Sequence, residues 1–418
     1  MNTTLHSPKL SGSIDAIPSK SHAHRLFIAA AFADKPTMIR CRSVNKDICA
    51  TIDCLNALGA DIRQVEDGVY EVKPVLGDIT GKPATLDVGE SGSTLRFMIP
   101  VALAAGADST FVCHGRLPER PLSPLYEQLV EHGANLSAKG TNPFLASGKI
   151  SGGAYELAGG VSSQFVTGLL LALPLTGKDA SIKLTGKIES RPYIDITLKT
   201  LRNFGVTASE ENSTFTLPAQ KYTSPGEIEV EGDWSNAAFF LVAGAFSDEG
   251  ITVGKVDLDS PQGDRAIVKI LSDFGADVTV GEHEVTVKRA KLCTPVVPVD
   301  ASDIPDLIPI VSVLASVSAG TTVIENCGRL RLKESDRLVT ICDTLTKLGA
   351  DVKIVGDSLV INGVKSLAGG TVSSYNDHRI AMAAAIAATV ADGDVTIEQS
   401  EAVAKSYPMF FEVMDSLM

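Results

Sequence analysis

The sequence predicts an α/β protein of two domains, each built from three copies of one repeated unit, with buried parallel helices surrounded by mixed sheets. Two repeating patterns support this fold class. A short motif around a glycine occurs five times, and a long apolar helix with a polar start occurs six times. Self-similarity at a fixed period indicates a repeat architecture, and mixed helix and strand patterns within each repeat indicate the α/β class.

The first pattern is "LGAD" at residues 58–61, which returns as "HGAN", "FGVT", "FGAD" and "LGAD". Its glycines are 70 to 74 residues apart and lie at Gly59, Gly133, Gly205, Gly275 and Gly349. Each glycine follows an amphipathic helical stretch and precedes two strand-like stretches, such as "DVKIV" and "SLVING". We therefore expect each unit to contain an outer helix, a glycine at its end and a pair of strands.

The second pattern is a set of six apolar helices, 70 to 73 residues apart. We expect them to start near Ser19, Ser91, Ser162, Asp233, Asp303 and Asn376. Side chains of this kind cap helix starts, where unpaired N–H groups and a partial positive charge also attract anions. The uncharged run 307–324, interrupted by Pro309 and Gly320, is interpreted as a buried helix leading into a strand, since a membrane span would be uninterrupted.

The sixth unit ends at the C-terminus before its strands could follow. The strand-like segment 5–14, "LHSPKLSGSI", is available to complete it, which would make one domain discontinuous. We therefore expect one domain at residues 20–231, a second at 1–19 with 232–418, and an active site in the cleft between them.

Composition excludes several classes of function. The net charge of −13 argues against a general affinity for nucleic acid or anionic membranes, so a bound anion must meet a local cluster of cations. Seven cysteines without a CxxC pair argue against disulfides and zinc sites, and indicate buried free thiols in a reducing cytoplasm. The N-terminal residues lack the apolar core of a secretory signal.

The helix starts carry more chemistry than capping requires. Polar and cationic groups gather there and in a few motifs between them, notably Lys20, Ser21, Arg25, Gly92, Arg120, Ser162, Ser163, Gln164, Ser190, Tyr193, Asp306, Lys333, Glu334, Arg337, His378, Arg379 and Lys405. Lys333 and Arg337 are four residues apart, so we expect them on one face of an outer helix. One interpretation is a pair of anion-binding surfaces; the alternative is a non-enzymatic scaffold whose polar helix starts are only caps.

Nine motifs, in order over nearly the whole chain, resemble the 5-enolpyruvylshikimate-3-phosphate synthase family. They are "PSKSHAHR", "ESGSTLRF", "ERPLSPL", "SSQFVTGLLLA", "SRPYIDIT", "IPDL", "RLKESDRL", "YNDHRIAMA" and "AKSYP". The resemblance implies transfer of the enolpyruvyl group of phosphoenolpyruvate to the 5-hydroxyl of shikimate 3-phosphate, with release of phosphate. It also implies no metal or organic cofactor, small anionic substrates as the only partners, and a monomer.

The resemblance also assigns residues. Contacts to shikimate 3-phosphate fall on Lys20, Ser21, Arg25, Ser162, Ser163, Gln164, Ser190, Tyr193, Asp306 and Lys333. Contacts to phosphoenolpyruvate fall on Lys20, Gly92, Arg120, Gln164, Arg337, Arg379 and Lys405. Asp306 is expected to be the base for the 5-hydroxyl. Glu334, Lys20 and Lys405 are candidates for the remaining proton transfers, and their division of labour stays open.

Departures from the family and a related family define the alternatives. Glu90 and Ser93 stand where members have Asn and Thr, and Arg329 where some have Asn, so Glu90 and Arg329 are left outside the site. UDP-N-acetylglucosamine enolpyruvyl transferases share the fold and the donor, but carry a loop Cys where this chain has Gly115. Because the expected cations are divided between the two domains, we also expect the ligands to draw the domains closed.

Overall fold

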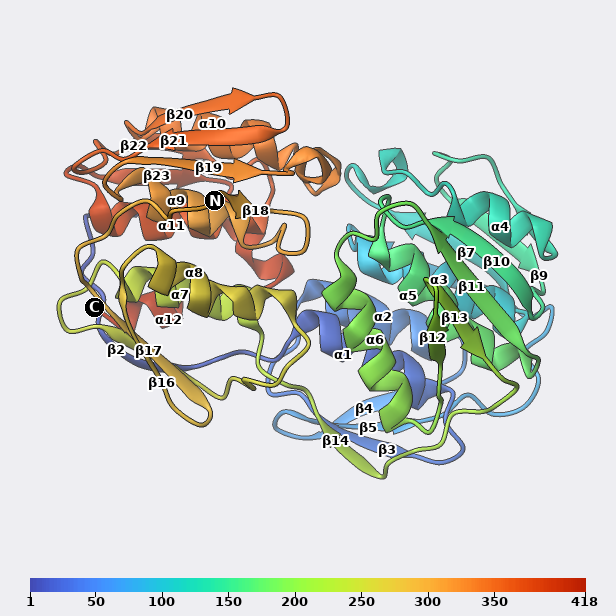
Figure 1. Ribbon diagram of the computed structural model, residues 1–418. Helices are drawn as coiled ribbons and strands as arrows, with labels where there is room; N and C mark the ends of the chain where they lie inside the picture. Colours follow the sequence, from blue (N-terminus) through green and yellow to red (C-terminus); the bar gives the residue numbers. More distant parts are fainter. The chain divides into compact units, whose positions relative to one another are not determined.

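The computed structural model describes all residues from 1 to 418, which fall into two units (Figure 1). The continuous unit comprises residues 18–230, and the split unit comprises residues 1–17 and 231–418. Each unit has its own hydrophobic core of buried helices packed against sheets.

The continuous unit holds three buried helices, α1 (Lys20–Ala31), α3 (Gly92–Ala105) and α5 (Ser163–Ala172). Three outer helices accompany them: α2 (Lys46–Ala57), α4 (Leu125–Glu131) and α6 (Arg191–Asn203). The first sheet has the order β14-β3-β5-β4 and is made of Glu227–Glu229, Thr37–Arg40, Val69–Lys73 and Asp61–Glu66. The second, β6-β7-β9-β8, is made of Pro83–Gly89, Asp108–Cys113, Phe144–Gly148 and Ala134–Leu136, and the third, β10-β11-β13-β12, of Gly153–Ala158, Ala180–Thr185, Thr214–Leu217 and Ser209–Glu211.

The split unit repeats the plan. Its buried helices are α7 (Trp234–Gly244), α9 (Ile308–Ser316) and α11 (His378–Ala387), and its outer helices are α8 (Ile267–Asp273), α10 (Arg337–Lys347) and α12 (Phe410–Asp415). The sheet β16-β17-β15-β2 is made of Asp277–Val280, Glu284–Lys288, Ile251–Gly254 and Gly12–Asp15. The sheet β18-β19-β21-β20 is made of Val299–Asp300, Thr321–Glu325, Ser358–Asn362 and Asp351–Val355, and β1-β23-β22 of Asn2–Leu5, Val395–Glu398 and Gly370–Ser373.

The predicted repeat is confirmed at the end of each outer helix. All five glycines of the series have a positive φ, between 73° and 108°, and each is the second residue after the end of α2, α4, α6, α8 or α10. This backbone conformation costs glycine nothing and strains other residues, which is why glycine returns at each position. The run 307–324 also forms the expected helix and strand, α9 followed by β19.

Four of the six helix starts are capped as predicted, by Ser19, Ser91, Ser162 and Asp233. The sixth helix also starts near Asn376 as predicted, with Asp377 as its cap. The prediction for the fifth helix was wrong, because α9 starts at Ile308, without a side-chain cap, and not near Asp303. Pro305 disfavours a helical conformation at Ile304, whereas Pro309 fits the first turn of a helix, so the start moves to Ile308.

The N-terminal strand was also misplaced. The segment that completes the sixth repeat is β1, which pairs with β23, and it lies ahead of most of the predicted segment 5–14. β2, within that segment, instead pairs in parallel with β15 of the fourth repeat. In the same way β14, just before α7, joins β3 of the first repeat. These strand exchanges follow pairing partners far along the chain, which a local pattern does not encode.

Two smaller findings concern the whole chain. All seven cysteines are free, but Cys49 and Cys293 are exposed, so the prediction that the thiols are buried holds only in part. No helix is long and apolar enough to cross a bilayer.

Candidate active site

In the split unit, Asp306 lies among three cations. One carboxylate oxygen accepts a hydrogen bond of 2.7 Å from the Arg337 guanidinium and one of 3.4 Å from Lys333 Nζ. The other oxygen lies 3.7 Å from a guanidinium nitrogen of Arg379. Asp306 precedes α9 and remains 21% exposed, so a substrate can reach it. A carboxylate held in this way can accept a proton from a bound hydroxyl while its position stays fixed.

Arg337 is the buried centre of this cluster, with a side chain 1% exposed. Its guanidinium donates to Asp306, to Glu334 at 2.8 Å and to both oxygens of Asp377 at 2.8 and 3.2 Å. Burial alone would lower the pKa of Arg337, but the three carboxylates outweigh it and raise that pKa well above its ordinary value. Arg337 therefore stays charged and orients two predicted catalytic carboxylates, Asp306 and Glu334.

The predicted helical face shared by Lys333 and Arg337 is wrong. Lys333 ends a short 3-10 turn, Gly328–Leu332, and α10 begins only at Arg337, where Asp336 caps it by accepting from the Val339 N–H. Both cations nevertheless reach Asp306. Burial lowers the pKa of Lys333 although the charge of Asp306 opposes that change.

Arg379 lies in the first turn of α11, and Lys405, at the end of the 3-10 turn Ser400–Lys405, reaches the segment before that helix. Arg379 is 2% exposed and donates to the carbonyl oxygen of Ser235 at 2.8 Å and to its hydroxyl oxygen at 2.5 Å. Lys405 Nζ donates at 2.7 Å to the carbonyl oxygen of Asn376, the residue before the α11 cap. The split unit thus brings together Asp306, Lys333, Glu334, Arg337 and Arg379, with Lys405 on the adjoining segment.

In the continuous unit, the start of α1 carries Lys20, Ser21 and Arg25. Lys20 Nζ is 3.0 Å from Asp47 of α2, and both side chains are only 16% exposed. Arg25 is 2% exposed and is held at the junction of α1, α5 and α6. It donates to the Thr197 hydroxyl at 2.8 Å, to the Thr167 hydroxyl at 3.2 Å, and to the carbonyl oxygens of Tyr193 at 3.0 Å and of Ser21.

The hydrogen-bond partners of Arg25 are all neutral oxygens, and burial lowers its pKa to about 9. A buried cation compensated only by dipoles favours the arrival of an anion nearby. The same bonds fix the backbone at Ser21 and Tyr193, two other predicted contacts. Ser190 precedes α6 with a φ of 54° and is 2% exposed.

The start of α3 brings two guanidinium groups close together. A Cβ added to Gly92 would lie 2.6 Å from a guanidinium nitrogen of Arg120 and 2.6 Å from one of Arg96, so the two cations come as close as only glycine permits. Arg96 also donates to Gln164 Oε1 at 3.1 Å, and Gln164 Nε2 donates to the Ser93 hydroxyl at 2.9 Å. Two guanidinium groups and a positive helix end favour a carboxylate or phosphate there.

The α5 start carries the remaining predicted residues. The hydroxyl of Ser162 caps the helix by accepting from the Gln164 N–H at 3.3 Å, and Ser163 is the first helical residue. Ser162 is therefore the cap of α5, and Ser163 is a buried residue of its first turn.

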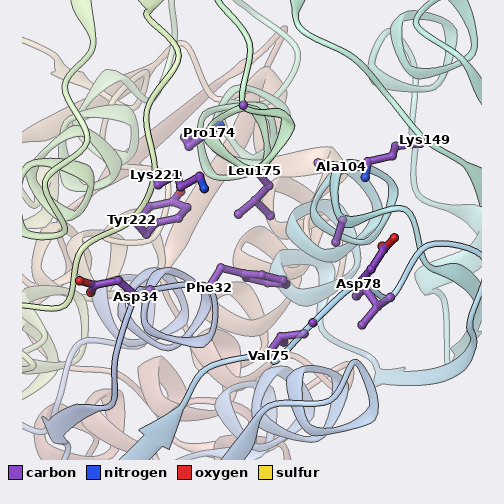
Figure 2. Close-up of a pocket in the computed structure, with 15 residues that line it drawn as sticks. Phe32, Asp34, Val75, Asp78, Ala104, Lys149, Pro174, Leu175, Lys221 and Tyr222 are labelled. Atoms are coloured by element: carbon purple, nitrogen blue, oxygen red, sulfur yellow. The ribbon is translucent and has the colours of Figure 1, made fainter.

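Figure 2 shows a cavity of about 350 Å³ in the continuous unit that contains none of the predicted residues. It lies where α1 and α3 end and after α5, and its lining includes Phe32, Leu175 and Tyr222 with Asp78 and Lys149. The candidate residues that these three helices carry lie at the opposite, N-terminal ends. The cavity and the candidate site are therefore separate.

Three residues that contact predicted site residues were missed from the sequence: Asp47, Arg96 and Asp377. Arg96 and Asp377 lie inside two of the motifs that carried the resemblance, and a charge within or beside an almost wholly apolar helix is the signal that could have found them. Asp47 gives no such signal, because its pairing with Lys20 depends on how α2 packs against α1.

Comparisons with known proteins agree on one family. A family model described as EPSP synthase (3-phosphoshikimate 1-carboxyvinyltransferase) matches residues 6–414. A 3-phosphoshikimate 1-carboxyvinyltransferase from Clostridium novyi is 41% identical over 98% of this chain and 96% of its own length. The solved EPSP synthase of Acinetobacter baumannii has a TM-score of 0.82 at 25% identity, covering 100% of this chain and 98% of that one. An enolpyruvyl transferase from Streptomyces tendae shares the fold, with a TM-score of 0.77 at 16% identity over 99% and 96% of the two chains.

Proposed function

This chain belongs to the EPSP synthase family, and from that membership and the geometry of its residues we infer how it performs the family's reaction. It is a transferase of the shikimate pathway, which moves the enolpyruvyl group of phosphoenolpyruvate to the 5-hydroxyl of shikimate 3-phosphate and releases phosphate. The comparisons do not support a UDP-N-acetylglucosamine enolpyruvyl transferase or a non-enzymatic scaffold.

The observation that carries the mechanism is the position of Asp306 among Lys333, Arg337 and Arg379. We assign Asp306 as the base that removes the proton of the 5-hydroxyl as its oxygen attacks phosphoenolpyruvate. The methylene carbon must gain a proton in the same step and lose one when phosphate leaves. Glu334, Lys20 and Lys405 are the candidates for these transfers, and Glu334 is the one that shares Arg337 with Asp306.

The binding assignment follows the distribution of cations. Arg25 and the hydroxyls at the starts of α1, α5 and α6 suit the phosphate and hydroxyl groups of shikimate 3-phosphate. Arg120 at Gly92, together with Arg337, Arg379 and Lys405, suits the carboxylate and phosphate of phosphoenolpyruvate, which a guanidinium fork can bind through two hydrogen bonds.

We propose that both units act on the same substrates, so that binding requires their closure around the ligands. Each unit carries several cations, and anionic ligands offset the repulsion between them. Small-angle scattering should therefore give a smaller radius of gyration with two ligands bound than with none. The ligands are shikimate 3-phosphate and, in place of phosphoenolpyruvate, glyphosate. An unchanged profile at saturation, with binding verified by calorimetry, contradicts the closure.

Replacing Arg120 with Lys should weaken phosphoenolpyruvate binding selectively. Lysine keeps the charge but loses the planar fork, so we expect the KM for phosphoenolpyruvate to rise roughly tenfold. The affinity for shikimate 3-phosphate, measured by calorimetry, should change less than twofold. The exposed Arg116 on the same segment offers the matched control, Arg116→Lys. Equal losses for both ligands are incompatible with the assignment of Arg120.

A phosphate-release assay tests the function itself. Purified protein should release phosphate from phosphoenolpyruvate with shikimate 3-phosphate as acceptor, and not with UDP-N-acetylglucosamine. Release only with the UDP-sugar would contradict shikimate 3-phosphate as the acceptor.

We further propose that the enzyme acts as a monomer in the cytoplasm, where its seven free thiols stay reduced. Sedimentation of the purified protein tests the monomer.

A further inference from the structure

A chain of buried polar side chains joins α1, α2 and α3 in the continuous unit, and the mechanism does not use it. His24 Nδ1 lies 2.7 Å from the hydroxyl oxygen of Thr51, which lies 2.8 Å from the hydroxyl oxygen of Thr94. All three residues are between 0% and 1% exposed. Burying polar groups is costly unless they are hydrogen-bonded, so a connected chain of them inside a helical core needs a reason.

The chain ends at Asp47 and Ser91. The Thr94 hydroxyl donates towards the backbone carbonyl oxygen of Asp47, at 3.2 Å, and towards the hydroxyl oxygen of Ser91, the cap of α3, at 2.8 Å. The carboxylate of Asp47 accepts a hydrogen bond of 3.0 Å from Lys20 Nζ. Thr94 therefore ties the partner of Lys20 to the helix start that carries Gly92.

The carbonyl group of Asp47 fixes the direction of these hydrogen bonds. A carbonyl oxygen only accepts, so the single hydroxyl hydrogen of Thr94 points to this end of the chain. Thr94 then accepts from Thr51, and the Thr51 hydroxyl accepts from the Nδ1–H of His24. Each group in the chain thus donates one hydrogen bond, in the order α1, α2, α3.

The ring of His24 is suited to begin this chain. Burial, and after it the charges of Lys20 and Arg25, lower the pKa of His24 well below its ordinary value, so the ring is neutral and carries one hydrogen. With that hydrogen on Nδ1, the Nε2 atom keeps a lone pair, and it is buried without a hydrogen-bond partner. The opposite tautomer would turn the hydrogen bonds of the chain around.

We propose that Thr51 and Thr94 are positioning residues of the reaction, which hold Asp47 in place and through it the ammonium group of Lys20. This inference rests on the proposed function of Lys20 as a contact of phosphoenolpyruvate. Lysine has a long, flexible side chain, and fixing it before the substrate arrives reduces the entropy that binding costs. Without the bond from Thr94, the first turn of α2 loses a contact to α3, and Asp47 holds Lys20 less well.

The test is the KM for phosphoenolpyruvate of Thr94→Val, which keeps the shape of the side chain and removes its hydroxyl group. We expect KM to rise about three- to tenfold, and Thr94→Ser, which keeps the hydroxyl, to stay within about twofold of the unchanged enzyme. Thr37→Val is the matched control, because Thr37 is also fully buried in this unit, with its hydroxyl oxygen 2.7 Å from that of Ser224. Equal KM values for Thr94→Val and Thr37→Val, raised or normal, overturn the proposal.

A double-mutant cycle tests the route through Asp47. Asp47→Asn removes the charge that holds Lys20, so adding Thr94→Val to it should raise KM by less than about twofold further. A further rise of about three- to tenfold would show that Thr94 acts independently of Asp47, and the proposal fails. Thermal denaturation verifies that each variant is folded.

A second measurement does not depend on catalysis. NMR spectra of enzyme with isotope-labelled histidine distinguish the two tautomers of a neutral ring, and the signals of His24 are those missing from His24→Asn. We expect the hydrogen on Nδ1. A hydrogen on Nε2 would reverse the chain, deprive the Asp47 carbonyl of its bond from Thr94 and overturn the proposal. The spectra decide this even if Thr94→Val does not fold or the unchanged enzyme releases no phosphate, a result that refutes the proposed function alone.

Discussion

Replacing Asp306 with Asn lowers turnover by roughly two orders of magnitude or more, if Asp306 is the base for the 5-hydroxyl. Asparagine keeps the size of the side chain and can still accept hydrogen bonds from Lys333 and Arg337, but it cannot take a proton. Substrate binding should survive, because the change removes a negative charge from a group of cations that we propose to bind the anionic substrates. The affinity for shikimate 3-phosphate, measured by calorimetry, should therefore stay equal or increase.

Two comparisons make this result specific. Asp303→Asn changes an exposed aspartate three residues away and should retain turnover within about twofold. Thermal denaturation of both variants verifies that they are folded. Near-normal turnover of folded Asp306→Asn would remove Asp306 from the mechanism, and a lost affinity for shikimate 3-phosphate would make it a binding group.

Replacing Arg337 with Met should destabilise the split unit by about 3 to 5 kcal/mol. The change leaves Asp377, which is 0% exposed, without its buried cationic partner, and it also removes partners of Asp306 and Glu334. Urea denaturation can follow this unit alone through the fluorescence of Trp234, the single tryptophan of the chain, which is buried in α7.

Arg331, in the same unit, is the matched control for Arg337. Arg331 pairs with Asp336 and Asp357 at the surface, with a side chain 38% exposed, so Arg331→Met should cost about 0 to 1 kcal/mol. Adding Asp377→Asn to Arg337→Met should restore part of the loss, since it removes the buried charge left alone. If Arg337→Met and Arg331→Met lower the free energy of unfolding equally, the contact of Arg337 with Asp377 contributes no more to stability than an exposed ion pair.

The repeat could be predicted from the sequence because its signals are local. A left-handed glycine after each outer helix and a polar cap before most buried helices depend on neighbouring residues only. The start of α9 was misplaced because Pro305 and Pro309 both lie near it. Only the three-dimensional structure shows that Pro309 is accommodated in the first turn of the helix. Lys333 and Arg337 were assigned to one helical face because charge spacing alone does not reveal the cap at Asp336.

Contacts between distant segments account for the other differences. Nothing near Arg96 in the sequence indicates that its guanidinium reaches Gln164, 68 residues later. Asp377 looks like a cap, and it is one, but its second role as the partner of Arg337 depends on α10 and α11 lying together. Catalytic clusters of this kind depend on packing more than on spacing.

The strand exchange has a consequence for how the chain folds while it is being made. The continuous unit needs no residue beyond β14, which ends at Glu229, so it can complete its sheets while the rest of the chain is still on the ribosome. The N-terminal strands emerge first, yet their partners emerge late: β15 at Ile251–Gly254 and β23 at Val395–Glu398. β1 therefore waits unpaired through almost the whole of synthesis, and a chain that stops before residue 395 leaves its first strand without a sheet to join.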